Sequence, residues 1–509
     1  MTQTEMTQKY VMVIDRGSTN IKVVLFDLQG REKKVVSRPC EAPVSIHYGW
    51  CEQDMEKIWD STKEGIRQIT EELEPGSEIL GVSVTGQGSG IFILDKEGNP
   101  ARAGILSLDT RPEKILKAWE KDGTADWWYE QTHGNLLFQS PACYLRWIKE
   151  NEPEVYEKIG AFFFSKDWVR YKLTGEIATE ITDASPGAML AGDEKSYFYE
   201  GFDRLGIPEM KDALPRLLYS GDPAGVITDS AANETGLKAG IPVFAGAHDM
   251  MASAFGVGNL SANQLVCVVG TWGANYVIGR TRKKKMSFPH IAPGYYLTGL
   301  LDGNSGSVQD YYIDKLYSKE KAELSQKDLY KFVEDSVLKS KPNQILFLPY
   351  LYGGLFEVNA AAGFIGVRNW HTRDEMMRAV FEGITFGHYA NIQELELDQM
   401  LTEAWVIGGG AKSKVLGQLF ADLMGIPVKI AECEEIPSRA VALTMLVSLG
   451  ICKSYEEACI PAEVKKIYEP DPKRHAYYQK KYKLFQKSMK ELNELWDELA
   501  EIRVDQTLN

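Results

Sequence analysis

Short apolar runs alternate with longer amphipathic stretches through most of the chain. Val11 to Ile14 and Val23 to Phe26 are apolar runs that predict strands at 11–15 and 22–27, separated by a turn of small polar residues. The stretch 54–73 places its apolar residues near one face of a helix, and the run 79–86 is typical of a buried strand. This alternation predicts an α/β protein.

The opening pattern returns in the second half of the chain. Residues 263–280 are again a strand, a turn of small residues and a strand, and residues 403–425 are a strand, a glycine turn and a helix. The repetition predicts two related α/β domains, 1–256 and 257–509, which meet at a cleft. The charged, amphipathic stretch 472–501 predicts long surface helices at the end of the second domain.

Composition narrows the possible partners. A chain of 509 residues is long for a single core, and its net charge of −14 disfavours binding to nucleic acid or to an anionic membrane. No run reaches the roughly 18 apolar residues that a membrane helix needs, and the polar first ten residues lack a signal-peptide core. The seven cysteines are scattered and form no C-x-x-C pair, so we expect a reducing cytoplasm, no disulfides and no structural zinc.

The two hairpin turns have the composition of phosphate-binding loops. Backbone N–H groups converge on a phosphate only where side chains leave room, and Gly17 and Gly270 leave that room. Asp15, at the end of the first strand, would repel a phosphate unless a cation lay between them, so it predicts Mg²⁺ held through water. Taken alone, each turn is explained equally well by the general preference of turns for small polar residues. The hydroxyl groups that can add donors are those of Ser18, Thr19 and Thr271.

Two further stretches carry candidate chemistry. The glycines of VIGGGAKS (406–413) predict either close helix–strand packing or flat backbone against an adenine or ribose, at Gly409 and Gly410. Asp249 follows the strand 242–246 and precedes a helix, so it is a helix cap or a general base. His248 has no second histidine at ligand spacing, which favours packing or hydrogen bonding over metal binding.

A polar collar for a polyhydroxy ligand is predicted near residues 87–111. Gln87 follows a buried strand and a glycine, and Asp109 and Arg111 precede a helix. An ordinary ion pair is the alternative explanation for Asp109 and Arg111. Three tryptophans suit either the apolar face of a sugar or the core: Trp50, Trp127 and Trp128.

The order of these motifs resembles that of the FGGY family of carbohydrate kinases, from about residue 11 to about residue 460. The matching stretches are DRGSTNIK, TGQGSG, LDTR, KDWVRYKLTGEIATEITDAS, GAHDMMASA, VGTWG, GFIG, EGITFGHYANI and GGGAKSKVLGQLFADLMGIPV. The resemblance implies two ribonuclease-H-like domains of the actin and sugar-kinase superfamily. It also implies an N-terminal sugar-binding domain, a C-terminal nucleotide-binding domain, and ATP with Mg²⁺ in the cleft.

The resemblance also assigns roles to individual residues. Asp249 is the expected catalytic base, and Asp15 and Asp249 are the expected neighbours of magnesium. The expected substrate-binding residues are Gln87, Gly88, Asp109 and Asp249. The expected ATP-binding residues are Gly17, Ser18, Thr19, Lys22, Gly270, Thr271, Trp272, Gly409, Gly410, Ala411 and Ser413.

The expected reaction is direct transfer of the ATP γ-phosphoryl group to a terminal hydroxyl of a small sugar or polyol. Stretches such as TGQGSGIFILDKEGNP and LFLPYLYG look most like kinases of L-xylulose and 3-keto-L-gulonate. An erythritol, D-xylulose or D-ribulose kinase is the alternative. Two other classes stay open: a catalytically silent sugar- and nucleotide-binding regulator, and a mechanical ATPase. We expect a cytoplasmic protein without nucleic-acid or membrane partners, and a homodimer is left open.

Overall fold

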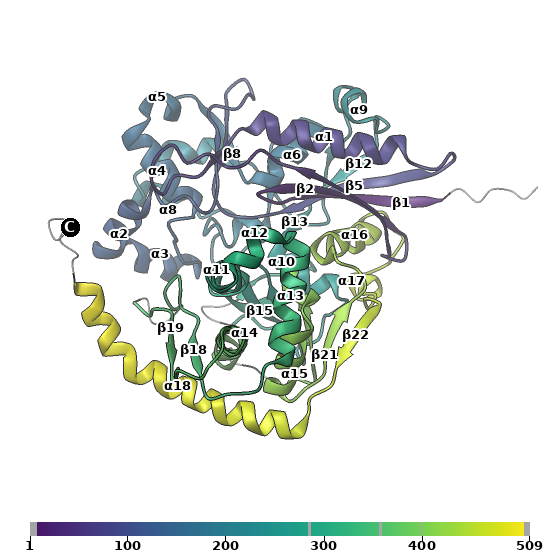
Figure 1. Cartoon of the computed structure of the whole chain (residues 1–509). Coiled ribbons are helices and arrows are strands. Elements are labelled where there is room, and N and C mark those ends of the chain that lie inside the picture. Colours follow the sequence, from purple (N-terminus) through teal and green to yellow (C-terminus); the bar gives the residue numbers. More distant parts are fainter. Residues whose placement is uncertain (1–7, 284–286, 356–358, 396, 398, 503–509) are drawn as a thin grey trace, which may run out of the picture. The chain divides into compact units, whose positions relative to one another are not determined.

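The computed structural model describes residues 8–283, 287–355, 359–395, 397 and 399–502 (Figure 1). They form two compact units. The first comprises the described residues within Met1–Leu260, Ile278–Leu297 and Glu435–Ala462. The second comprises those within Ser261–Val277, Thr298–Glu434 and Glu463–Asn509.

The mixed sheet of the first unit begins as a meander and continues with parallel strands. β1 (Lys9–Arg16), β2 (Asn20–Asp27) and β3 (Glu32–Pro39) are antiparallel neighbours, and β5 (Glu78–Gly86) runs parallel to β1. Beyond β5 lie β12 (Pro242–Phe244), parallel to it, and then the antiparallel β11 (Pro223–Val226). The short β13 (Ala247–His248) also pairs with β5 in parallel.

Helices cover both faces of this sheet. Figure 1 shows α1 (Met55–Glu71) and α6 (Ser165–Thr174) on one face and α16 (Ile436–Ser448) on the other. Val11 to Ile14 are fully buried, as a strand covered on both faces requires. The remaining helices of this unit are α2 (Glu113–Lys121), α3 (Thr124–Thr132), α4 (Pro141–Asn151), α5 (Pro153–Tyr156), α7 (Ile181–Ala184), α8 (Gly201–Arg204), η1 (Pro208–Ala213), α9 (Asp229–Thr235), α10 (Asp249–Gly256) and α17 (Tyr455–Ala458). Its short strands are β4 (Glu52–Gln53), β6 (Phe92–Asp95), β7 (Gly104–Ile105), β8 (Ile159–Phe163), β9 (Ala178–Glu180) and β10 (Arg216–Leu218).

The second unit repeats the same strand order. Its sheet contains the run β17-β15-β14-β20-β21-β22, in which β15 is antiparallel to β14, β20 and β21 continue parallel to β14, and β22 is an antiparallel edge strand. This agreement between two sheets confirms the internal repeat that the sequence predicted. The strands are β14 (Gln264–Val269), β15 (Gly273–Gly279), β17 (Tyr296–Asp302), β18 (Leu346–Leu348), β19 (Gly363–Ile365), β20 (Glu403–Ile407), β21 (Val428–Ala431) and β22 (Val464–Tyr468). β16 (Ser287–Pro289) pairs with β17 but lies in a segment of the first unit. The helices are α11 (Gly306–Leu316), α12 (Ser318–Glu323), α13 (Gln326–Lys339), α14 (Arg373–Gln393), η2 (Gly409–Lys412), α15 (Lys414–Met424) and α18 (Pro472–Glu501).

The units are not continuous in sequence, whereas the sequence predicted one division between 256 and 257. Part of the second half belongs to the first unit because α16 is apolar almost all round and packs against α10, β1 and β5. The charged C-terminal stretch forms one helix, α18, rather than several. Its buried aromatic residues, among them Tyr482 and Phe485, join the core of the second unit.

Two further observations concern the chain as a whole. All seven cysteines are free thiols. Within the part of the chain that the structure describes, every helix is too short or too polar to cross a membrane.

Candidate active site

Three strands of the first unit end side by side at one edge of its sheet. Asp15 on β1 and Ala247 on β13 both pair with Thr85 on β5, and Arg16 and His248 both pair with Gly86. Because these strands are parallel, their carboxyl ends lie at the same edge, as binding sites in α/β sheets do. The register therefore brings together the predicted residues that follow: Gly17, Gln87 and Asp249.

Asp15 lies in a cluster of carboxylates. Burial raises the pKa of Asp15 to about 7, and the negative charges of Asp249 and Glu435 act in the same direction. Lys22, which pairs with Asp15 across the hairpin, opposes that shift, but its Nζ lies 2.8 Å from Glu435 Oε1. Arg16 also opposes the shift, so three carboxylates lie near two cations and one negative charge is left over.

The carbonyl oxygens of the first hairpin turn, at residues 17–19, accept hydrogen bonds from other parts of the protein. The buried Arg16 donates from Nη1 to the oxygen of Gly17 at 3.2 Å, and Gln53 Nε2 donates to the oxygen of Ser18 at 3.2 Å. The oxygen of Thr19 accepts a bond from the backbone of Cys40 at 2.8 Å. Each of these oxygens thus has a donor within the protein. A Cβ at position 17 would lie 2.9 Å from the backbone oxygen of Asn20, so the turn needs glycine there.

Asp249 is the first residue of α10, and its side chain is 30 % exposed. The residue that caps α10 is His248, whose Nδ1 accepts the N–H of Met250 at 3.2 Å. Asp249 lies in the first turn of α10, close to the backbone N–H groups at that end of the helix. It is an accessible carboxylate whose backbone is fixed by the strand before it and the helix after it. These are the properties that a general base needs.

In the second unit, the two predicted nucleotide loops leave neighbouring parallel strands. β14 and β20 pair with Val268 opposite Ile407, so the turn at 270–272 and the glycines after 407 emerge at the same edge. The backbone of the turn at 270–272 is held by α11, because the N–H of Gly306 donates to the oxygen of Gly270 at 2.8 Å. Thr271 and Trp272 are exposed, Trp272 by 42 %.

The glycines at 408–410 serve different purposes. A Cβ at Gly410 would lie 2.4 Å from Val269 Cγ1, so this glycine permits close packing of the loop on β14. Gly409 has open space around it and offers bare backbone. Ala411 is part of the single turn of η2. Ser413 caps α15 by accepting the N–H of Leu416, and its hydroxyl donates to Glu334 at 2.8 Å.

Gln87 and Gly88 lie at the edge where β5 ends. The Nε2 atom of Gln87 is buried without a hydrogen-bond partner among the described residues. A Cβ at Gly88 would meet His248 Cδ2 at 1.9 Å and Asp183 Oδ1 at 2.5 Å, so position 88 has room only for glycine.

Asp109 is held away from the solvent. Its side chain is 0 % exposed, and Oδ1 accepts a bond from Arg111 Nε at 2.8 Å. Oδ2 accepts bonds from Arg111 Nη2 and from the backbone of Cys51, each at 2.6 Å. Arg111 in turn stacks on Trp50 at 3.8 Å from the ring centre. In this structure Asp109 therefore orients Arg111 and has no oxygen open to a ligand.

The three tryptophans predicted to contact either a sugar or the core differ in their burial. Trp128 is 1 % exposed and belongs to a hydrophobic cluster, against which Trp127 packs. Trp50 is partly exposed and contacts Arg111. Of the three tryptophans, Trp50 is the one next to the proposed collar.

Comparison with known proteins decides the family. The model of the FGGY family of carbohydrate kinases, N-terminal domain, matches residues 10–256, and that of the C-terminal domain matches residues 265–448. The chain belongs to the FGGY family of carbohydrate kinases. This FGGY kinase therefore phosphorylates a small sugar with ATP, and it is an enzyme rather than a silent regulator or a mechanical ATPase.

Relatives of full length support the same assignment. The L-xylulose/3-keto-L-gulonate kinase of Escherichia coli (strain K12) is 32% identical over 487 residues, which cover 94% of this chain and 96% of the relative. The ligand-bound xylulose kinase from Lactobacillus acidophilus superposes with a TM-score of 0.86 at 25% identity, covering 96% of this chain and 100% of that chain. The gluconate kinase from the same organism gives a TM-score of 0.86 at 25% identity, covering 97% and 100%. The predicted two-domain α/β fold of the sugar kinases is confirmed.

Sequence reasoning missed several residues of this site in the FGGY kinase. Glu435 lies 413 positions from Lys22, and no local pattern connects the two. Glu334 is an ordinary charged position of an amphipathic helix. Asp183 and its neighbours lie within a quoted family stretch, but no role was assigned to them.

Proposed function

We propose that Asp249 is the general base of this FGGY kinase, and that it takes the proton from a terminal hydroxyl of a small keto sugar. The hydroxyl oxygen then attacks the γ-phosphorus of ATP, the bond from that phosphorus to the bridging oxygen breaks, and ADP leaves. The observation that carries the proposal is the shared register of β1, β5 and β13, which gathers Asp15, Gln87 and Asp249 at one edge.

The two units divide the remaining roles. In the first unit, Gln87 and Gly88 would contact sugar hydroxyls, and the unpartnered Nε2 of Gln87 supports this role. Asp109 would act through Arg111, because its own oxygens are occupied. The phosphate-binding residues would be Gly17, Ser18, Thr19 and Lys22, with Lys22 exchanging Glu435 for phosphate oxygens. In the second unit, the nucleotide residues would be Gly270, Thr271, Trp272, Gly409, Gly410, Ala411 and Ser413.

The carboxylates fit Mg²⁺. Among the described residues, no three His, Cys, Asp or Glu side chains form a set of metal ligands. Mg²⁺ prefers one or two carboxylates together with water and substrate phosphates, and the excess negative charge around Asp15 fits such a site. Asp15 and Asp249 would hold the ion through water, and the bound ion would neutralise phosphate charge.

The proposed substrate is L-xylulose or 3-keto-L-gulonate. The relative that is 32% identical carries these two names. Erythritol, D-xylulose and D-ribulose are the alternatives. We also propose a cytoplasmic location, which the seven free thiols support. A homodimer stays a prediction, which the elution volume in gel filtration tests.

A substrate panel tests the proposal. The purified chain is incubated with ATP, Mg²⁺ and one of six acceptors: L-xylulose, 3-keto-L-gulonate, D-xylulose, D-ribulose, erythritol or D-gluconate. ADP release is followed, and ³¹P NMR identifies the phosphorylated carbon. We expect the highest kcat/KM with L-xylulose or 3-keto-L-gulonate and a phosphate ester at a terminal carbon. A higher kcat/KM with any other acceptor, or an ester at an internal carbon, contradicts the proposed substrate.

A further inference from the structure

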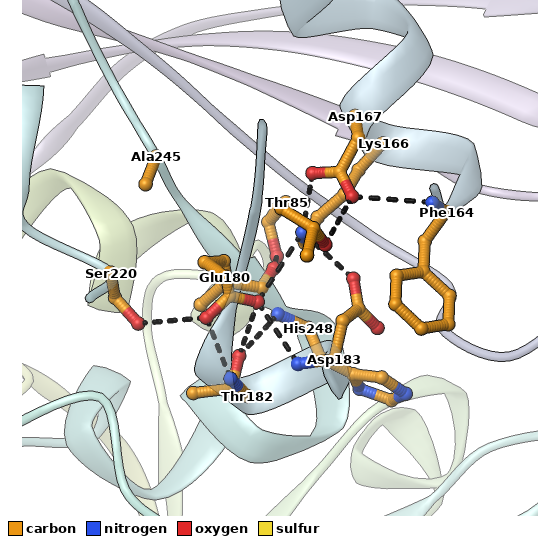
Figure 2. A network of polar contacts seen from close by, with 12 residues as sticks. Thr85, Phe164, Lys166, Asp167, Glu180, Thr182, Asp183, Ser220, Ala245 and His248 are labelled. Carbon is orange, nitrogen blue, oxygen red and sulfur yellow. Dashed lines mark hydrogen bonds and ion pairs between the residues drawn. The ribbon is translucent and has the colours of Figure 1, made fainter. Parts of the chain in front are cut away.

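Two clusters of charge take no part in the proposed function, and they differ in exposure. The first is a network around Lys166 in the first unit (Figure 2). Lys166 Nζ lies 2.7 Å from Asp183 Oδ2, 2.9 Å from Asp167 Oδ1 and 3.3 Å from Glu180 Oε1. Because all of these side chains are fully buried, they offer no surface to a partner. The second cluster lies on α18 of the second unit and is exposed.

α18 consists of a basic part followed by an acidic part. Every exposed charged side chain from 480 to 490 is positive, and every one from 491 to 501 is negative. Of these side chains, Lys487 and Glu491 form an ion pair of 3.5 Å, and within the described part of the chain most of the others have no ion-pair partner. The basic residues are Lys480, Lys483, Lys487 and Lys490, and the acidic residues are Glu491, Glu494, Asp497, Glu498 and Glu501.

This order of charges does not stabilise the helix itself. After the cap residue Asp471, the first turn of α18 holds Lys473 and Arg474 and no acidic residue, and the last turn holds no basic residue. The helix dipole favours the opposite order, with acidic residues at the N-terminus and basic residues at the C-terminus. Lysine placed before glutamate along a helix is also the weaker order for pairs four residues apart. The separation of charge therefore needs a cause outside α18.

An apolar stripe runs along one flank of both parts of α18. Its members Leu484, Leu495 and Leu499 are 51, 46 and 51 % exposed. Their spacing repeats with the helical period, so they share one flank, whereas Phe485 and Trp496 enter the core of the second unit. Exposed apolar side chains bordered by charged ones are typical of a surface that binds another protein.

Two copies of α18 complement each other when they lie antiparallel. The basic part of one copy then runs along the acidic part of the other, and the two helix dipoles oppose each other. With the twofold axis near residues 491–492, Leu484 lies opposite the partner's Leu499, and Leu495 lies opposite the partner's Ser488. A parallel pair would instead bring like charges together. The charges of α18 thus select a second copy of this chain, in one orientation.

We infer that α18 is a self-complementary interface through which two copies of this chain bind each other antiparallel. The apolar stripe forms the centre of the interface, and the lysines and acidic residues beside it form the rim. The inference does not depend on the role of Asp249, because none of the residues placed in the active site lies on α18. A failure of either idea therefore leaves the other intact.

Charge reversal tests the interface. One variant carries Lys480→Glu, Lys483→Glu and Lys487→Glu, and a second carries Glu494→Lys, Glu498→Lys and Glu501→Lys. Each variant alone brings like charges together, so we expect its dimer Kd in sedimentation equilibrium to rise at least about 10-fold. An equimolar mixture of the two restores opposite charges along the whole contact. It should form a dimer of one copy of each, with a Kd within about threefold of the parent.

Leu495→Ser tests the apolar stripe and should also raise the dimer Kd at least about 10-fold. The matched control is Leu338→Ser on α13, where the leucine is 50 % exposed, and it should leave the Kd unchanged. Far-UV circular dichroism shows that each variant is folded. The inference is overturned if the parent sediments with the mass of one chain at about 100 µM, in which case a different protein covers the stripe. Reversed variants that dimerise like the parent, a mixture that stays monomeric, or a Leu495→Ser protein with the parental Kd would overturn it as well.

Discussion

At the scale of single residues, Asp15 occupies a position that lowers the stability of the folded protein. Asp15 has its pKa raised to about 7, first by burial and then by Asp249 and Glu435. A carboxyl group with a raised pKa destabilises the folded state wherever the unfolded chain ionises it. The penalty is absent below about pH 4, grows as the pH rises toward 7 and is complete above it. Residues kept under such strain are typical of functional sites.

Asp15→Asn should therefore stabilise the protein at high pH only. We expect its Tm to exceed that of the parent by about 2–4 °C at pH 8, with no gain at pH 4, because asparagine carries no charge. Differential scanning calorimetry at both pH values, without ligands, measures this. Asp335→Asn on the exposed face of α13 is the control and should not shift Tm at either pH. A gain of equal size at pH 4 would show that charge is not the cause.

At the scale of elements, loops at strand ends are held by contacts that a sequence does not display. Hydrophobic periodicity located β1, β2, α1 and β5 to within two residues of their observed bounds. It could not show that the hydroxyl of Ser413, the cap of α15, also donates to Glu334, because Glu334 lies on another helix, α13. The same limit applies to Asp109: its spacing to Arg111 is visible in the sequence, but the hydrogen bond that it accepts from the backbone of Cys51 is not.

Ser413→Ala should act mainly on stability. Loss of the cap of α15 is expected to lower the free energy of unfolding by about 1 kcal/mol. Ser413→Thr keeps a hydroxyl group and should recover most of that loss. Urea unfolding followed by circular dichroism gives the stability, and the KM for ATP is measured on the same samples. A Ser413→Ala protein of parental stability would contradict the capping role.

At the scale of the whole molecule, the repeat was readable from the sequence and the interleaving of the units was not. Two copies of a strand–turn–strand pattern predict two related sheets, because each copy keeps the same order of apolar and small polar residues. The assignment of α16 to the first unit depends instead on packing between distant segments. Arg439 on α16 is buried and donates to the backbone oxygens of Gly30 at 2.8 Å and of Gly256 at 2.5 Å.

A fragment that ends at residue 260 should therefore not fold. Without α16, the apolar surfaces of β1, β5 and α10 stay uncovered and the carbonyls of Gly30 and Gly256 lose their buried donor. We expect this fragment to aggregate or to melt without a cooperative transition. The control joins the same fragment through glycine–serine linkers to residues 278–297 and 435–462, the other two segments of the first unit, and it should recover cooperative melting. A cooperative transition in the shorter fragment would contradict the interleaved arrangement.

The measurement that tests the central claim most directly is the turnover of Asp249→Asn beside its ligand binding. Isothermal titration calorimetry gives the Kd values for ATP and for the best sugar of the panel, and rapid quench gives the rate of phosphoryl transfer. We predict Kd values within about threefold of the parent and a transfer rate lowered by about 10²–10⁴-fold. A transfer rate within tenfold of the parent would contradict the role of Asp249 as the base.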